Sequence, residues 1–482
     1  MADTVAPMIT DSVTSGGPTT PGDAPAPVSL RGFLELVRTK RKADYVEVSR
    51  RVSPRFETAA IVTALEAKRR SPILVFRDVE GTSLPVVTNV GGSMGRLALA
   101  LGCSLSEVGS RFEQAAARRI EPVEVAGQDA PVHEVVQWGE EVDLGWLPPM
   151  VYHADDNERP YLTAAMVVAR DPETGIGNLS YHRMMILGRD RTGIYMERGR
   201  HLHGIYEKHR ARGEAMPIAV VNGLHPAVTL GSLYAGTAEV DEYEIIGGLL
   251  GRPLPVARTV TGTGLLVPAH AEIVLEGEVS VTEDADEGPF GEFTGYATGA
   301  TRTPVFRVRA ITHRRDPYFQ DIVSGGMEHL LLSMPALEHR TLRDARAACA
   351  GVRRVALPAP LTAIVSLAKA DDDEPRRVIE ALLRSDIYAK HVIIVDEDVD
   401  PSDLREVMAA MALQTQADTK VVILSGEQGT PLDPSCPRED GRSAKMGIDA
   451  TRPLVPARPV TRNRIPPEVL DAVDLAEILG RK

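Results

Sequence analysis

The sequence predicts a multidomain protein of the mixed α+β and α/β class, and three observations lead to this. Its 482 residues exceed the size of one hydrophobic core. In the middle third, short β-branched runs alternate with Gly and Pro, which predicts a mostly antiparallel sheet or barrel. The last third alternates strand and helix patterns, as a βαβαβ parallel sheet does. We expect a disordered tail (1–28), domains over 29–125, 126–322 and 323–462, and a C-terminal helix (463–482).

Composition and charge exclude several classes of protein. The chain has 54 Lys and Arg against 67 Asp and Glu, a net charge of −13, so its surface repels nucleic acid and anionic membranes. No apolar run approaches the roughly 20 residues of a membrane-spanning helix. Residues 1–28 lack the basic and apolar regions of a signal peptide. Cys103, Cys349 and Cys436 are too far apart for a disulfide framework or a zinc site, which indicates a reducing cytoplasm.

The first folded segment, 29–125, has the pattern of a small α/β unit. Ser29 is a suitable N-cap for a helix whose apolar face runs from Leu30 to Val37. Further helices are expected over 56–68, 97–101 and 105–116, and strands over 73–76 and 84–88.

The central segment, 126–322, has more strand patterns than helix patterns. Helical periodicity appears near 203–212 and 241–250 only. β-branched runs bounded by Gly or Pro predict the strands. These runs are 162–168, 218–221, 254–260, 272–275, 279–281 and 305–311.

The last domain lacks the signatures of nucleotide binding. It has neither a G-x-G-x-x-G following a strand nor a P-loop sequence. Its predicted elements are strands over 361–367, 391–395 and 420–424, and helices over 375–384 and, after the cap Ser402, around 404–411.

An amphipathic helix is expected after Pro466 and Pro467. A terminal helix of this kind packs on another subunit or on its own chain, and the sequence leaves both open. Its apolar face comprises Val469, Leu470, Val473 and Ala476.

Two carboxylates flank a short turn in the sequence Glu287-Gly-Pro-Phe-Gly-Glu292. Glycine permits a close backbone approach and proline stiffens the turn, so both carboxyl groups can enter one cleft beside Phe290. Two neighbouring carboxylates in apolar surroundings do not both ionise readily, and the protonated one can serve as a general acid. From composition alone, a surface hairpin with solvated glutamates is the better interpretation.

A second polar segment runs from Asn178 to Arg183. Strand geometry places Asn178, Ser180 and His182 on one face and Arg183 on the other, unless the strand bends. Amide and hydroxyl oxygens suit a hard cation, and a guanidinium suits a carboxylate. The alternative is a polar edge strand.

Two weaker signals lie elsewhere in the chain. His201 and His203, with Glu242, offer imidazole and carboxylate groups to Mg²⁺ or Mn²⁺ with a phosphate, although surface histidines explain this spacing better. Lys445 precedes a turn with a buried-looking sequence and is uninformative by itself.

Together these four segments resemble the UbiD family of decarboxylases, which use prenylated FMN. The match covers the chain from about residue 30 to the C-terminus. It implies an N-terminal α/β unit, a central split β-barrel that binds flavin, and a C-terminal α/β domain that mediates oligomerisation, so a homodimer or larger homo-oligomer is expected. The most specific parts are Asn178-x-Ser-x-x-Arg183, Glu287-Gly-Pro-Phe-Gly-Glu292 and Lys445-Met-Gly-Ile-Asp-Ala-Thr451.

The resemblance also assigns site residues. Arg183, Glu287 and Glu292 stand at the family's catalytic positions, with Glu292 as the proton donor. The ligands of its divalent ion, Mn²⁺ or Mg²⁺, match Asn178, His201 and Glu242, while His203 is a poorer match; K⁺ is a further candidate ion. Cofactor contacts are implied for Asn178, Ser180, Tyr181, His182, Arg183, Arg200, His201, Ser232, Leu233, Glu242 and, at the phosphate, Lys445.

The implied activity is reversible, non-oxidative decarboxylation of an α,β-unsaturated or (hetero)aromatic carboxylic acid. Loss of CO₂ leaves a carbanion that no side chain stabilises, so an electron sink such as the modified flavin is needed. Arg183 would orient the substrate carboxylate and keep Glu287 ionised, and that charge would favour the protonated form of Glu292.

The substrate itself is not determined by the sequence. The segment 325–332 is expected to line the substrate side, with Glu328 and Leu332 as pocket residues. A flavin prenyltransferase would supply the cofactor. Other readings are a flavin reductase-like enzyme, a metal-dependent hydrolase on a similar barrel, or a non-catalytic assembly partner. The paired carboxylates with an arginine favour the decarboxylase.

Overall fold

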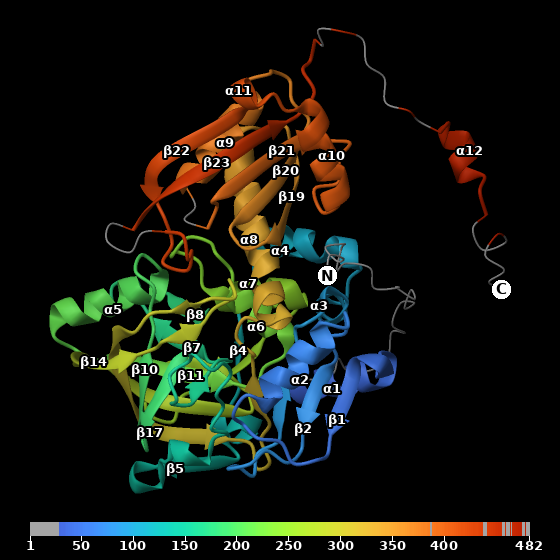
Figure 1. Cartoon of the computed structure of the whole chain (residues 1–482). Helices are drawn as coiled ribbons and strands as arrows, with labels where there is room; N and C mark the ends of the chain where they lie inside the picture. The colour runs from blue at the N-terminus through green and yellow to red at the C-terminus, as the bar shows by residue number, and fades with distance from the viewer. Residues whose placement is uncertain are drawn as a thin grey trace.

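The computed structural model describes residues 28–385, 388–436, 441–455, 458, 463, 465–474 and 478. Figure 1 shows the N-terminal and central regions packed together, with the C-terminal domain above them and the helix α8 (Met327–Ala348) joining the two parts. The mixed multidomain class is as predicted. The tail expected over 1–28 lies outside the described residues except for Val28, which is buried.

The N-terminal region is built around a four-stranded sheet in the order β1-β2-β3-β18. Ser29 caps the first helix as predicted, since its Oγ accepts the amide of Gly32 at 3.1 Å. The fourth strand, β18 (Phe319–Asp321), comes from the far end of the central region and pairs in parallel with β3. The other elements are α1 (Leu30–Lys40), η1 (Lys42–Asp44), β1 (Tyr45–Val48), α2 (Glu57–Glu66), β2 (Ile73–Phe76), β3 (Val86–Thr88), α3 (Met94–Leu101), η2 (Leu105–Glu107) and α4 (Val108–Ala117).

The central region contains a nine-stranded sheet in which all the pairs are antiparallel, as expected. Its order is β6-β9-β10-β17-β14-β11-β7-β8, with β5 paired to β17, and within the described residues this path is open. Its strands are β5 (Val135–Trp138), β6 (Tyr161–Leu162), β7 (Met166–Arg170), β8 (Gly177–Tyr181), β9 (Met184–Gly188), β10 (Arg191–Ile194), β11 (Met216–Asn222), β14 (Ile273–Glu287) and β17 (Thr301–His313).

Two of the predicted strands, 272–275 and 279–281, belong to the single long strand β14. The polar break between them is a bulge in the pairing of β14 with β17, not a turn. Glu276 at this break is buried, and its carboxylate accepts the backbone amides of Val260 and Thr261 at 3.0 and 2.9 Å. Because Glu and Gly are typical of loops, the sequence predicts a break here, whereas the strand is continuous.

Helices and short strands surround this sheet. The helix α6 was not predicted, and it packs against α7 and α8. These elements are β4 (Val123–Glu124), η3 (Gly127–Asp129), η4 (Pro131–His133), η5 (Gly139–Glu141), η6 (Leu144–Trp146), α5 (His201–Arg212), α6 (Pro226–Ser232), α7 (Glu242–Leu250), β12 (Pro255–Arg258), β13 (Leu266–Pro268), β15 (Phe290–Gly291) and β16 (Ala297–Thr298).

The C-terminal domain has a five-stranded sheet in the order β19-β20-β21-β23-β22. The prediction that 420–424 is the third parallel strand is wrong. That segment lies in β22, an antiparallel edge strand, and β23 is the strand that pairs in parallel with β21. The elements are β19 (Val352–Ala359), β20 (Thr362–Leu367), α9 (Glu374–Ser385), β21 (His391–Asp396), α10 (Leu404–Gln414), α11 (Ala417–Lys420), β22 (Val421–Gln428) and β23 (Arg442–Ala450).

Two helix ends differ from expectation. The cap of α10 is Asp403, not Ser402, because the Asp403 carboxylate accepts the amides of Arg405 and Glu406. The C-terminal helix is short within the described residues, α12 (Pro467–Asp471), and Ala476 lies outside them. The apolar residues of this segment, Val469, Leu470 and Val473, are exposed. No helix in the described part of the chain is long and apolar enough to cross a membrane.

Close packing of α9 on β23 gives a stability prediction. A Cβ added at Gly447 would lie 2.1 Å from Cγ2 of the buried Ile379. We expect Gly447→Ala to lower the free energy of unfolding of this domain by about 1–3 kcal/mol in urea denaturation. The control is Gly109→Ala in α4, where a Cβ meets nothing within 4 Å. Equal stability of the two variants would contradict the packing.

Candidate active site

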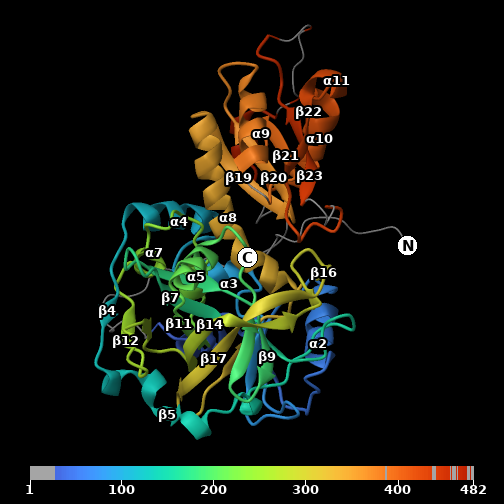
Figure 2. The same ribbon diagram turned by 90° about the vertical axis from the view of Figure 1, so that its left-hand side faces the viewer.

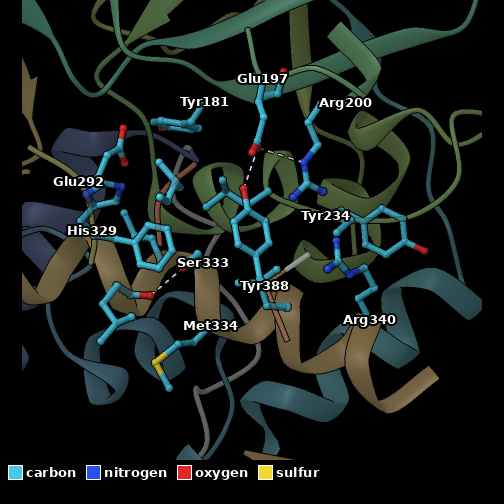
Figure 3. A pocket seen from close by; sticks show the side chains of 18 of the residues that line it. Tyr181, Glu197, Arg200, Tyr234, Glu292, His329, Ser333, Met334, Arg340 and Tyr388 are labelled. Atoms are coloured by element: carbon cyan, nitrogen blue, oxygen red, sulfur yellow. Dashed lines mark hydrogen bonds and ion pairs between the residues drawn. The ribbon is translucent and has the colours of Figure 1, made fainter. Parts of the chain in front are cut away.

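A cavity of about 510 Å³ lies where the central region, α8 and the C-terminal domain meet. Figure 3 shows Tyr181, Glu197 and Arg200 on one side and, from α8, His329, Ser333, Met334 and Arg340 on another, with Tyr388 between them. The cavity wall therefore comes from segments that are far apart in the sequence.

Arg183 is shared by two carboxylates at this wall, one buried and one partly buried. Its Nε and one terminal nitrogen each donate to Glu287 at 2.9 Å, and its other terminal nitrogen donates to Glu292. The side chains of Arg183, Glu287 and Glu292 are 7%, 0% and 12% exposed. The guanidinium also lies 4.3 Å from the centroid of the Tyr195 ring. The sequence-predicted set is thus brought together.

The segment from Glu287 to Glu292 is a buried turn and not a solvated hairpin. It follows β14, contains the cis peptide Gly288–Pro289, and continues into β15. Gly288 has φ +80°, a conformation that favours glycine. The ring of Phe290 stacks on that of Tyr161 with centroids 4.2 Å apart. The turn thereby directs both carboxylates toward Arg183.

The electrostatics of Glu292 suit a proton donor. Burial raises the pKa of its carboxyl group, Arg183 opposes this shift, and the charge of Glu287 adds to it. A carboxyl group with a raised pKa keeps its proton closer to neutral pH than an exposed glutamate does. The arrangement can therefore deliver a proton to an atom bound in the cavity.

Asn178, His201 and Glu242 form a second cluster in the same cavity. Glu242 Oε1 accepts the Asn178 amide at 3.2 Å and lies 4.0 Å from His201 Nδ1. Burial raises the pKa of Glu242 to about 8, against the hydrogen bond from the backbone amide of Leu179. A buried carboxylate beside an imidazole and an amide oxygen fits a divalent cation, whose charge would favour the ionised carboxylate. His203 instead lies 4.0 Å from Glu207 on its own helix.

The expected cofactor-wall residues also line the cavity. Ser180 Oγ lies 3.3 Å from Asn178 Oδ1 and 2.8 Å from His182 Nε2, so these three side chains form one polar row, as alternation predicts. Arg183 joins the same wall because the chain bends between β8 and β9. The remaining expected residues at the wall are Tyr181, Arg200, Ser232 and Leu233.

Two expected site residues lie elsewhere in the structure. Lys445 is buried in β23, where its ammonium donates to the Leu383 carbonyl at 2.8 Å, and it is not among the cavity-lining residues. Glu328 is buried in the first turn of α8, and its carboxylate accepts the backbone amides of Asn89 and Gly91, each at 2.7 Å. Glu328 thus ties α8 to the N-terminal region, whereas Leu332 does line the cavity.

One contact between domains at the cavity has no signal in the sequence. Tyr388 of the C-terminal domain donates its hydroxyl to Glu197 at 2.6 Å, and Arg200 donates to the same Glu197 oxygen at 3.3 Å. The Arg200 guanidinium lies 5.0 Å from the centroid of the Tyr388 ring (Figure 3). Glu197 and Tyr388 are 191 positions apart, so no local sequence pattern indicates this contact.

Comparison with known proteins places this chain in one family. Three domain profiles match almost the whole described chain: the N-terminal, Rift-related and C-terminal domains of 3-octaprenyl-4-hydroxybenzoate carboxy-lyase, over residues 36–116, 123–327 and 332–450. The chain belongs to the UbiD family of carboxy-lyases.

Individual relatives are decarboxylases. The anhydromevalonate phosphate decarboxylase of Methanosarcina mazei is 32% identical over 92% of this chain and 100% of its own length. The phenolic acid decarboxylase of a Streptomyces species is 32% identical over 89% of this chain and 92% of its own.

Solved structures of similar fold also come from UbiD-class enzymes and decarboxylases. The UbiD-class enzyme HmfF from Pelotomaculum thermopropionicum, in complex with FMN, has a TM-score of 0.84 and 36% identity, covering 93% of this chain and 99% of that one. The closed form of vanillic acid decarboxylase from Sedimentibacter hydroxybenzoicus has a TM-score of 0.85 and 28% identity, covering 95% and 100%.

The hydrogen bonds of His182 give a prediction about its protonation. Its Nδ1 faces the Tyr195 carbonyl at 2.8 Å and so carries the proton, while Nε2 accepts from Ser180. Burial lowers the pKa of His182 from 6.5 to about 4. In NMR of histidine-labelled protein, the His182 signal is the one that His182→Gln removes. We expect its chemical shift to remain that of a neutral imidazole down to about pH 5.

The lowered pKa of His182 also makes the folded state sensitive to acid. Because the unfolded chain binds this proton more readily, stability falls as the pH drops from 6.5 toward 4, and it falls less in His182→Gln. A titration midpoint of the His182 signal near 6.5 would contradict the burial.

Proposed function

We propose that this protein is a prenylated-FMN-dependent decarboxylase of an α,β-unsaturated or (hetero)aromatic carboxylic acid. The observation that carries the proposal is the guanidinium of Arg183 held between buried Glu287 and partly buried Glu292 at the wall of a cavity. An arginine suits the substrate carboxylate, and a carboxyl group with a raised pKa suits the protonation that follows loss of CO₂.

The donor set supports the cofactor and its ion. Asn178, His201 and Glu242 would hold Mn²⁺ or Mg²⁺, which would anchor a flavin phosphate and do no redox chemistry. The polar row of Ser180 and His182 lies beside them. When bound, the prenylated flavin supplies the electron sink that decarboxylation needs.

The chain's own residues have separate parts in the proposed reaction. Arg183 orients the substrate carboxylate toward the cofactor side of the cavity. Glu287 fixes the guanidinium through two parallel hydrogen bonds and contributes the charge that favours protonated Glu292. Glu292 then gives its proton to the carbon from which CO₂ has left.

The substrate class is supported by the relatives and by the cavity lining. Relatives act on anhydromevalonate phosphate and on phenolic acids. Phe290 and Phe293 flank Glu292 at the wall, and they suit a planar, apolar framework next to the carboxylate. We propose a flavin prenyltransferase as the cofactor's supplier and a homo-oligomer as the assembly.

Reconstitution tests the function directly. Protein made without a flavin prenyltransferase should be inactive, and prenylated FMN with Mn²⁺ should restore CO₂ release from a panel of unsaturated and aromatic acids. His201→Ala and Glu242→Ala should lower flavin occupancy more than thermal stability. Equal turnover with plain FMN, or full flavin retention in both variants, would contradict the proposed cofactor site. A colourless, inactive reconstituted protein would favour an assembly role.

The proposed proton donor gives a quantitative prediction. Glu292→Gln keeps the shape but loses the proton, so the rate should fall by about 10²–10⁴-fold with flavin occupancy unchanged. Activity of the wild type should fall as the pH rises through the raised pKa of Glu292. Glu287→Gln removes a charge that raises this pKa, so the alkaline limb of its rate profile should move to lower pH.

A matched control is available on the same strand. Asp286 neighbours Glu287, is exposed, and pairs with Arg302 at the surface. Asp286→Asn should therefore leave both the rate and its pH profile unchanged. Near-native decarboxylation with solvent-deuterium incorporation in Glu292→Gln would show that another group donates the proton.

A further inference from the structure

The turn that carries Glu292 is bonded to a segment that the proposed reaction does not use. We infer that Asp156 is a positioning residue, which sets the place of Glu292 through the backbone of Gly291. The inference rests on the proposed role of Glu292 as the proton donor. Asp156 acts through Gly291 and does not touch the substrate.

The contact between Asp156 and Gly291 is short and buried. Asp156 Oδ1 accepts the Gly291 amide at 2.7 Å, and the Asp156 side chain is 2% exposed. Its other oxygen accepts the backbone amide of His153 and faces His153 Nδ1, both at 3.0 Å. Hydrogen bonds to an ionised carboxylate are among the strong ones, and burial makes this one costly to lose.

The rest of the turn is held from the same side. Asn157 donates its side-chain amide to the Gly288 carbonyl at 3.0 Å and its backbone amide to the Pro289 carbonyl at 2.7 Å. Tyr161 accepts the Gly288 amide at 3.1 Å. Within the described residues, β15 pairs with the two-residue strand β16 alone. Side chains and loop backbone therefore supply the bonds that a longer sheet would otherwise give.

Glu292 has little freedom at its own backbone. The Glu292 amide donates to the Tyr296 carbonyl at 3.0 Å, while the preceding amide, of Gly291, donates to Asp156. A Cβ at Gly291 would lie 2.7 Å from His153 Nδ1, so the backbone is packed directly on the His153–Asp156 pair. Ser324 donates its hydroxyl to the Gly291 carbonyl.

These contacts fix the position of the Glu292 Cα, from which its side chain extends. If the Asp156 carboxylate is removed, the Gly291 amide loses its buried acceptor and the turn can relax toward the vacated space. A displacement of about 1 Å at a reacting group can cost about 10²-fold in rate. The loss should appear in the proton-transfer step, because the proposed metal ligands Asn178, His201 and Glu242 lie on other elements, β8, α5 and α7.

The test compares two neighbouring aspartates in the reconstituted holoenzyme. Asp156→Ala should lower kcat about 10–100-fold, with KM and flavin occupancy within twofold of wild type. Asp155, exposed in the same segment, is the matched control, and Asp155→Ala should leave all three unchanged. Ser324→Ala is a milder change that removes a hydrogen bond to the carbonyl of the same residue, Gly291, and it should give a smaller loss of kcat with the same unchanged KM.

The outcomes separate this inference from the proposed function. If the wild-type holoenzyme releases no CO₂ from any acid, the proposed function and this inference both fail. If the wild type is active and Asp156→Ala keeps kcat within twofold, the inference alone is overturned. The same holds if Asp156→Ala loses flavin and activity in parallel, so that kcat per bound flavin is unchanged. If Asp156→Ala does not fold, Ser324→Ala decides by the same criteria.

Discussion

The site depends on one buried ionic arrangement: a single guanidinium faces two carboxylates that are almost fully removed from water. Burying an ionisable group is unfavourable unless it is paired and hydrogen-bonded or takes up its neutral form. Glu287 makes two parallel bonds to Arg183, which leaves Glu292 with the remaining nitrogen and a raised pKa. The fold must therefore bring the bend after β8 against the turn after β14. The two long strands β14 and β17 hold that turn in place.

The surroundings of this arrangement show how the fold meets that requirement. β14 and β17 pair along most of their length, so the position of Glu287 at the end of β14 is fixed by the sheet. Beyond it the sheet pairing is short, and the turn is held by Asn157, Tyr161 and Asp156 instead. A rigid strand followed by a turn bonded through side chains places two carboxylates at different angles on one guanidinium.

Local sequence patterns were sufficient for part of this structure. The Ser29 cap, the strand Ile73–Phe76 and the polar row after Asn178 depend on neighbouring residues, and they were predicted correctly. The interpretations failed where long-range pairing decides the outcome. The strand partner of β21 and the continuity of β14 through Glu276 both depend on contacts across the molecule. Asp156 and Tyr388 carried no recognisable motif for the same reason.

Through the contact of Tyr388 with Glu197 and Arg200, two domains together form the wall of the cavity. The long helix α8 joins these two domains (Figure 2). Any molecule that touches both walls gains affinity from the docked arrangement and, by thermodynamic reciprocity, strengthens the docking to the same degree. If the C-terminal domain also adopts a position in which Tyr388 is away from Glu197, occupancy of the cavity and docking of the domains belong to one equilibrium. A probe of interdomain distance would report ligand binding without monitoring any chemistry.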